Sequence, residues 1–306
     1  MIDLERPQGA RLFFTLRGSI LPKIGVAIAA CTGFAIVVTL LHGDLFGWKV
    51  TLTALPFSMI GLALAISLGF RNNAAYDRYS EARKLWGELI TRSRSLARQV
   101  QGLTRPETAG ELPATMIRRE IAFAHALRHQ LRDSDPAAEV APWLSPADLA
   151  AFRGSRRGSN ALLRQQGDDL GRLVRAGALE PNLAAGVDAT LSAIGATAAG
   201  CERIKNTPIP FPYTLLLHRT VSMYCFLLPF GIVDTVGALT PLVVAIVAYT
   251  FFGLDAIGSE IEEPFALALH HLPLESMSRT IEIDLREALG DADLPPALPP
   301  VGYRLD

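Results

Sequence analysis

The sequence predicts an all-α membrane protein whose chain crosses the bilayer four times and carries a large cytosolic helical bundle. Half of the 306 residues are hydrophobic and only 19% are charged, a balance that disfavours an ordinary soluble protein. No Asp, Glu, Lys or Arg occurs in residues 24–43 or in residues 50–70. Uncharged stretches of this length are typical of membrane-spanning helices.

Four segments have the length of such a helix. Residues 24–41 and 50–70 would extend roughly 27 Å and roughly 31 Å at ~1.5 Å per residue, which matches a hydrocarbon core of ~30 Å. Two later apolar segments, 212–233 and 236–257, complete the four. Two alternatives stay open. The first segment resembles a signal peptide in its basic flank, and the last two segments would also suit a buried hairpin of a soluble domain.

The distribution of Lys and Arg orients these spans. Basic residues precede the first span and follow the second one, beginning with Arg71 and Arg78, whereas the loops at 42–49 and 234–235 contain only Lys49. The positive-inside rule therefore places both termini and the long middle segment in the cytoplasm. The predicted domains are a cytosolic N-terminal segment (1–23), a first transmembrane helix pair (24–70), a cytosolic helical domain (71–210), a second transmembrane helix pair (211–257) and a cytosolic C-terminal segment (258–306).

The middle segment has the pattern of packed amphipathic helices. Apolar residues recur at helical spacings without strand-like alternation, for example at Leu85, Leu89, Leu96 and Val100. Dipeptides that contain Pro or Gly separate these stretches. Ser145 precedes a proline at the first helical position and an acid in the first turn, so we expect this serine to cap a helix.

The sequence contains no recognisable catalytic or metal-binding motif. It lacks His-Glu-x-x-His, Cys-x-x-Cys, a phosphate-binding glycine loop and a Gly-x-Ser-x-Gly turn. His125 and His129 have helical spacing, and His270 adjoins His271, but no third ligand accompanies either pair. The three cysteines are interpreted as small buried hydrophobic residues. We therefore expect no metal, no cofactor and no enzyme activity, and the charge pattern does not predict a nucleic-acid surface.

The second span carries two parallel stripes of side chains. Small residues form one stripe, at Gly61, Ala65 and Gly69, and small residues let a neighbouring helix approach closely in a bilayer. Bulky apolar residues form the other stripe one position later, at Leu62, Ile66 and Phe70. If several copies packed through the small stripe, the bulky stripe would line a narrow hydrophobic pore. The alternative is an ordinary lipid-facing helix, because small and apolar residues occur in many spans.

Polar residues interrupt the third span. His218 and Arg219 would lie in the hydrocarbon or near its edge, where an unpaired charge is costly. Three prolines at 208, 210 and 212 make an irregular start to this span. One interpretation is an arginine that extends to the interface, and the other is a water-filled vestibule.

Several motifs together resemble those of bacterial bestrophins over residues 11–290. They are Leu16-Arg17-Gly18-Ser19-Ile20, Pro56-Phe57-Ser58, Gly69-Phe70-Arg71-Asn72-Asn73 with Tyr76 and Tyr79, Cys201-Glu202-Arg203-Ile204, Asn206-Thr207-Pro208-Ile209-Pro210 with Tyr213, and Glu262-Glu263-Pro264-Phe265 with Leu272-Pro273-Leu274. The resemblance implies a homopentameric ion channel of the bacterial inner membrane, with one central pore, four spans in each subunit and a helical cytosolic vestibule.

The resemblance also implies where the pore is narrow. Members of the family have a hydrophobic neck of three apolar residues, and the matching positions here are Leu62, Ile66 and Phe70. A second constriction is expected at the cytosolic exit, on the helix that leads into Cys201, near Asn182, Leu183 and Val187.

Eukaryotic relatives bind calcium in an acidic run after the Pro-Phe pair. Here Pro264-Phe265 is followed by Ala266-Leu267-Ala268-Leu269, which offers no carboxylate oxygen for calcium. The preceding Glu260, Glu262 and Glu263 are interpreted as a solvated or ion-paired face, so we do not expect calcium activation of the eukaryotic kind.

Charges at the mouths of the pore must select the sign of the ion, because an apolar neck does not. Arg71 follows Phe70 directly and would be a pore-mouth charge that favours anions if it faced the pore. Residues 235–306 carry 3 basic and 11 acidic side chains, a net charge of −8 that would favour cations. By analogy with bacterial members, we favour monovalent cations over chloride.

The predicted function is passive conduction of monovalent ions by a homopentamer in the lipid bilayer. Two rivals stay open, a secondary transporter and a membrane-anchored scaffold or signalling protein. A transporter would show internal repeats, and the sequence contains none that we recognise.

Overall fold

The computed structural model describes residues 15, 18–45, 48–49, 53–268, 270–301 and 304–306. Leu16, Arg17 and the first three residues of the predicted span 50–70 lie outside them. The described chain is built from helices, together with a two-residue antiparallel ladder between β1 (Asp44–Leu45) and β2 (Trp48–Lys49). This agrees with the predicted all-α class.

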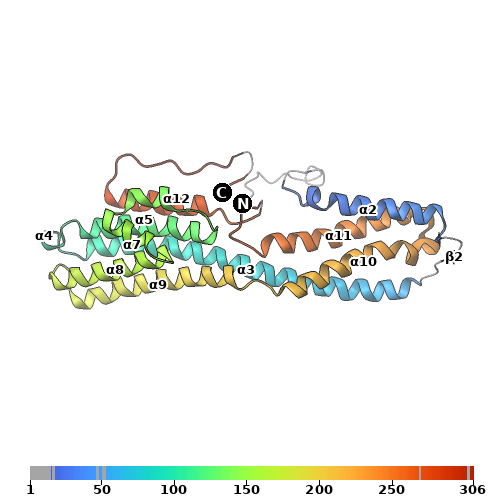
Figure 1. The fold of residues 1–306 in the computed structure, drawn as a ribbon, viewed down its shortest axis with the longest axis horizontal. Helices are drawn as coiled ribbons and strands as arrows, with labels where there is room; N and C mark the ends of the chain where they lie inside the picture. The colour runs from blue at the N-terminus through green and yellow to red at the C-terminus, as the bar shows by residue number, and fades with distance from the viewer. Residues whose placement is uncertain (1–14, 16–17, 46–47, 50–52, 269, 302–303) are drawn as a thin grey trace. The chain divides into compact units, whose positions relative to one another are not determined.

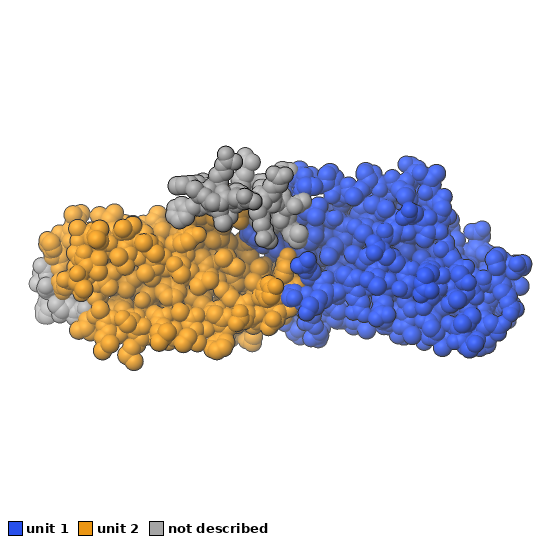
Figure 2. All heavy atoms as spheres, turned by 180° about the vertical axis from the view of Figure 1, so that it is seen from behind, with its two compact units in different colours: residues 1–3, 80–207, 265–306 blue, residues 4–79, 208–264 orange. Residues whose placement is uncertain are grey.

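The chain divides into two compact units, which Figure 2 shows in different colours. The first helical unit contains Ser80–Thr207 and Phe265–Asp306. The second, which we call the apolar unit, contains Pro208–Pro264 and the described residues up to Tyr79. Helix α3 (Ala54–Gly102) contributes to both units.

The apolar unit consists of α2 (Leu21–Leu40), the first part of α3, α10 (Phe211–Val236) and α11 (Thr240–Ile261) (Figure 1). A short 3₁₀ turn, η2 (Gly237–Leu239), joins α10 to α11. The chain reverses there through Gly237, whose φ of 60° favours glycine. The core of the unit comes from all four helices and includes Ile24, Leu68, Val221 and Val244.

Four stretches in the described chain are long and apolar enough to cross a membrane by length and composition. They are Leu21–Leu40, Ala54–Gly102, Pro181–Asn206 and Phe211–Ile261. The last stretch contains both late predicted spans, which η2 divides into α10 and α11. Pro181–Asn206 was not among the predicted spans, and its mean hydropathy of 1.2 is the lowest of the four.

The other unit is a helical bundle. Its members besides the second part of α3 are α4 (Pro106–Ala109), α5 (Leu112–Leu131), α6 (Ala137–Val140), η1 (Ala141–Trp143), α7 (Pro146–Arg153), α8 (Gly158–Arg175), α9 (Pro181–Asn206) and α12 (Leu274–Leu289). Helix α5 lies at its centre and packs on α8, α9 and α12. Every residue from Met116 to Arg128 is buried except Arg118, so α5 has almost no solvated face.

The helical unit contains one predicted feature, a serine cap, and one helix that was not predicted. Ser145 caps α7, since its Oγ accepts a hydrogen bond of 3.1 Å from the backbone N–H of Asp148. This confirms the predicted cap. Helix α12 was not anticipated as part of this bundle, because it comes from the segment that follows the last predicted span.

Candidate pore helix and its charge network

The first part of α3 has two distinct faces. Phe57, Leu64 and Leu68 are buried in the core of the apolar unit. Their spacing of seven and four residues places them on one side of the helix. On another side, Leu62, Ile66 and Phe70 are 65%, 52% and 67% exposed. The described chain therefore leaves three bulky apolar side chains uncovered, one helical turn apart.

The small-residue stripe has two different surroundings. A Cβ atom added at Gly61 would lie 2.7 Å from the hydroxyl oxygen of Tyr224 on α10, so this glycine allows α10 to pack closely within the apolar unit. Gly69 has nothing within 4 Å of the same position, and Ala65 is exposed. In the described chain, Gly61 is therefore covered by α10, whereas Ala65 and Gly69 are uncovered.

Arg71 is the centre of a buried charge network at the end of this apolar stretch. Its side chain is 0% exposed. Its Nη1 donates to Oδ1 of Asp255 at 2.6 Å, and its Nη2 donates to Ser259 Oγ at 2.8 Å and to Oε2 of Glu262 at 3.2 Å. Two carboxylates from α11 and its end therefore balance the guanidinium charge, as a buried cation requires.

The predicted role of Arg71 needs correction. It was expected as a charge at the pore mouth, but the apolar unit encloses it and pairs it with acidic groups. The prediction failed because the main partner of Arg71, Asp255, lies 184 residues further along the chain, and the sequence alone does not show which helices pack together.

Asp255 also explains one of the polar residues of the third span. Its second oxygen, Oδ2, lies 2.8 Å from Nδ1 of His218, whose side chain is 59% exposed. Arg219 is exposed on the next position of α10. The histidine is therefore tied to the buried network, whereas the arginine lies on the surface of the unit.

Acidic residues before the Pro-Phe pair are partly ion-paired, as expected. Glu262 contacts Arg71, and Oε1 of Glu260 lies 3.4 Å from Nζ of Lys23. In the described chain, no group of three or more His, Cys, Asp or Glu side chains is arranged to hold a metal ion.

The predicted cytosolic aperture lies at the start of α9. Asn182 is exposed and Leu183 is 38% exposed. Val187 is completely buried in the helical unit, because it lies on the face of α9 that packs into the bundle. Val187 therefore cannot line an aperture in this arrangement, which corrects that part of the prediction.

His125 and His129 are part of an ion-pair cluster. Nε2 of His125 lies 3.1 Å from Oε2 of Glu282 on α12, and Glu139 contacts both histidines as well as Arg128. Burial lowers the pKa of His129, and the neighbouring Arg128 lowers it further. The cluster joins α5, α6 and α12, so both histidines take part in ion pairs inside the helical unit.

A carboxyl group is completely buried in the same bundle. Glu120 accepts a hydrogen bond from Ser93 at 2.8 Å, and Gln166 Nε2 lies 3.5 Å from its other oxygen. Burial raises the pKa of Glu120 to about 8, against the opposite effect of these two hydrogen bonds. The carboxyl is therefore protonated at neutral pH, which avoids a buried unpaired charge.

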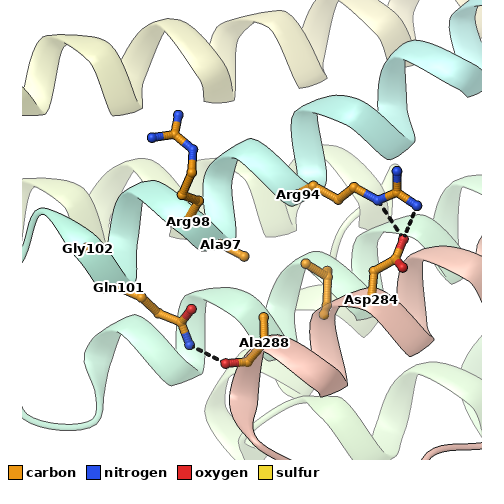
Figure 3. Close-up of a pocket in the computed structure, with 8 residues that line it drawn as sticks. Arg94, Ala97, Arg98, Gln101, Gly102, Asp284 and Ala288 are labelled. Atoms are coloured by element: carbon orange, nitrogen blue, oxygen red, sulfur yellow. Dashed lines mark hydrogen bonds and ion pairs between the residues drawn. The ribbon is translucent and has the colours of Figure 1, made fainter.

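A groove of about 470 Å³ lies between the second part of α3 and α12. Figure 3 shows Arg94 directed at Asp284 and Gln101 directed at the backbone of Ala288. Arg98 points away from both partners in this view. The polar groups that cross the groove are satisfied by each other, so they connect the two helices.

The comparisons with known proteins agree with this arrangement. A sequence profile of the bacterial/fungal bestrophin protein family matches residues 1–287. The chain belongs to the bacterial/fungal bestrophin family. This bestrophin is 41% identical over 299 residues to the voltage-dependent anion channel-forming protein YneE of Escherichia coli K12, with 97% of each chain covered.

A second relative extends this similarity. The voltage-dependent anion channel-forming protein of Mesorhizobium japonicum is 40% identical over 304 residues, which cover 98% of this bestrophin and 95% of the relative. Among solved structures, a variant of a bacterial bestrophin homologue from Klebsiella pneumoniae matches with a TM-score of 0.84 and 35% identity. The match covers 88% of this bestrophin and 100% of that chain.

Family and relatives together support an ion channel and not an enzyme. The resemblance stated from the sequence motifs is thereby confirmed. The four apolar stretches of helix fit a membrane channel of this family.

Proposed function

We propose that this bestrophin is the subunit of a homopentameric channel in the bacterial inner membrane that passes monovalent ions passively. In this proposal both termini are cytoplasmic, and the neck of the pore consists of Leu62, Ile66 and Phe70 from every subunit. The observation that carries it is the uncovered apolar stripe on α3. In water or lipid alone such a stripe has no specific partner, but around an axis it forms a narrow hydrophobic constriction.

The surroundings of the stripe support an assembly around α3. Ala65 and Gly69 lie beside it and leave open space on the subunit surface. Small side chains permit close approach of a second copy. The opposite face of α3 is already used within the subunit by Phe57, Leu64 and Leu68. Asn182 and Leu183 are proposed to form the second, cytosolic constriction.

Monovalent cations are the proposed permeant ions. The charge of Arg71 is balanced by Asp255 and Glu262, so it does not offer a local site for anions. The C-terminal part of the chain, with its net charge of −8, has the sign that attracts cations. Chloride is the second candidate, because the named relatives are called anion channel-forming proteins.

Recordings from purified protein in planar bilayers test this proposal. The triple variant Leu62→Ala, Ile66→Ala, Phe70→Ala widens the proposed constriction, so the single-channel conductance should rise while the oligomeric mass stays the same. A matched control truncates exposed apolar residues of α11, Leu242→Ala with Ile246→Ala. A conductance that is unchanged in the triple variant, or raised equally in the control, would rule out this neck.

A further inference from the structure

One acidic residue continues the proposed neck face of α3. Helix α3 runs without interruption from Ala54 to Gly102, and Asp77 follows Phe70 by seven residues and Ile66 by eleven. At 3.6 residues per turn, both intervals bring Asp77 to within about 20° of the same helix face. Asp77 therefore lies on the same helix face as the neck residues, roughly 10 Å along the helix from Phe70 at ~1.5 Å per residue.

The carboxylate of Asp77 has no polar partner in the described chain. The residue is exposed, and among the described residues its side chain forms no hydrogen bond or ion pair. The acidic residue one turn further differs, because Oε1 of Glu81 lies 2.6 Å from Nη2 of Arg203. Glu88 is likewise paired with Arg92 at 3.1 Å. Asp77 thus has no arginine partner among the described residues, whereas the other two carboxylates are ion-paired.

The basic groups near the same face of α3 either form polar contacts of their own or lie too far along the chain to cancel the charge of Asp77. Arg71 is buried among acidic partners, and Nε of Arg78 donates to the backbone oxygen of Glu262 at 3.1 Å. Lys84 is exposed, but it follows Phe70 by fourteen residues, twice the interval to Asp77, and belongs to the other compact unit. The Debye length at physiological salt is ~8 Å, so a charge within the apolar unit that lies close to the neck has the stronger effect there.

We propose that Asp77 is the residue that gives this channel its preference for cations. Five copies, one from each subunit, would form a ring of carboxylates at the cytosolic end of the neck. Such a ring raises the local concentration of K⁺ or Na⁺ and lowers that of Cl⁻ at the point where an ion leaves or approaches the hydrophobic constriction. This inference rests on the proposed neck, because the register of Asp77 is counted from Phe70.

Reversal potentials under a KCl gradient test the inference. Wild-type protein should prefer K⁺ over Cl⁻. Asp77→Asn should lower this permeability ratio at least about threefold, since it removes every charge of the ring, and Asp77→Lys should shift the preference toward Cl⁻. Asp77→Glu keeps the charge and should keep the ratio. The matched control Lys84→Gln changes an exposed charge further along α3 and should leave the ratio nearly unchanged.

The neck variant separates this inference from the proposed function. If the triple alanine variant raises the conductance but Asp77→Asn leaves the permeability ratio unchanged, the charge ring is wrong and the neck stands. A wild-type channel that prefers Cl⁻ would also overturn the ring. If the triple variant has no effect on the conductance, the neck itself fails, and the assignment of Asp77 fails with it.

Discussion

The buried pair of Arg71 and Asp255 gives the sharpest prediction for the stability of the subunit. Asp255→Ala removes the carboxylate that lies 2.6 Å from Nη1 of Arg71. The guanidinium is then left with Glu262 and Ser259, although its side chain is completely buried. Removal of one partner from a buried ion pair destabilises a protein by about 3–5 kcal/mol, because the remaining charge stays out of water.

Thermal unfolding of the purified protein in detergent measures this effect. A domain of 150–250 residues loses about 2–4 °C of Tm for each kcal/mol, so Asp255→Ala should lower the Tm by roughly 6–20 °C. The exposed pair in the same unit provides the control. Lys23→Ala removes a contact of 3.4 Å to Glu260, and the lysine side chain is 54% exposed. Exposed pairs contribute about 0–1 kcal/mol, so this variant should change the Tm only slightly.

A double variant distinguishes the loss of a pair from the loss of packing. Arg71→Met combined with Asp255→Leu replaces both charges by apolar groups, and it should be less destabilising than Asp255→Ala alone. If Asp255→Ala lowers the Tm no more than Lys23→Ala does, the buried network does not stabilise the apolar unit and the reasoning is refuted.

Two further predictions concern one buried group in each unit. The pKa of Glu120 rises from 4.5 to about 8 on folding, so the folded protein binds the additional proton between these pH values and loses on the order of 1 kcal/mol of stability per pH unit as the pH rises through them. Glu120→Gln cannot ionise, so its unfolding free energy should gain on that of wild type as the pH rises from about 4.5 to about 8 and keep this advantage above pH 8; a difference that stays the same across this range would contradict this. Gly231→Ala should destabilise by about 1–3 kcal/mol, because its Cβ would clash with the ring of Phe57, whereas Gly69→Ala meets open space in the subunit. Equal Tm values for the two glycine variants would disprove the close approach.

The helical class and the location of the late spans could be predicted from the sequence, because each depends on a local pattern. Uncharged stretches mark α2 and the first part of α3, apolar stretches with few charges mark α10 and α11, and periodic leucines mark the buried faces of the helical unit. The uncovered stripe on α3 could be found in the same way, since its three residues are one turn apart. The spacing of residues was sufficient to predict a feature whenever all of its residues lie on one helix.

Features that depend on contacts between distant residues could not be predicted. Arg71 has the position of a surface charge in its own helix, but its partner lies on α11. Val187 has the spacing of an aperture residue beside Asn182 and Leu183, yet one turn of α9 brings it onto the packed face. In both cases the side chain is buried by a neighbouring helix, and a single sequence does not show which helix that will be.

Labelling of a cysteine in the neck tests the central claim most directly. The chain has three cysteines, and all of them are buried, so they should not compete with an introduced cysteine for a reagent added in water. Phe70→Cys should react with a small cationic methanethiosulfonate reagent added in water, and the current should change irreversibly, because the claim places this side chain in the ion path. Val26→Cys, on an exposed apolar position of α2, should neither react nor change the current. If Phe70→Cys behaves like Val26→Cys, the stripe on α3 faces lipid and the proposed pore is wrong.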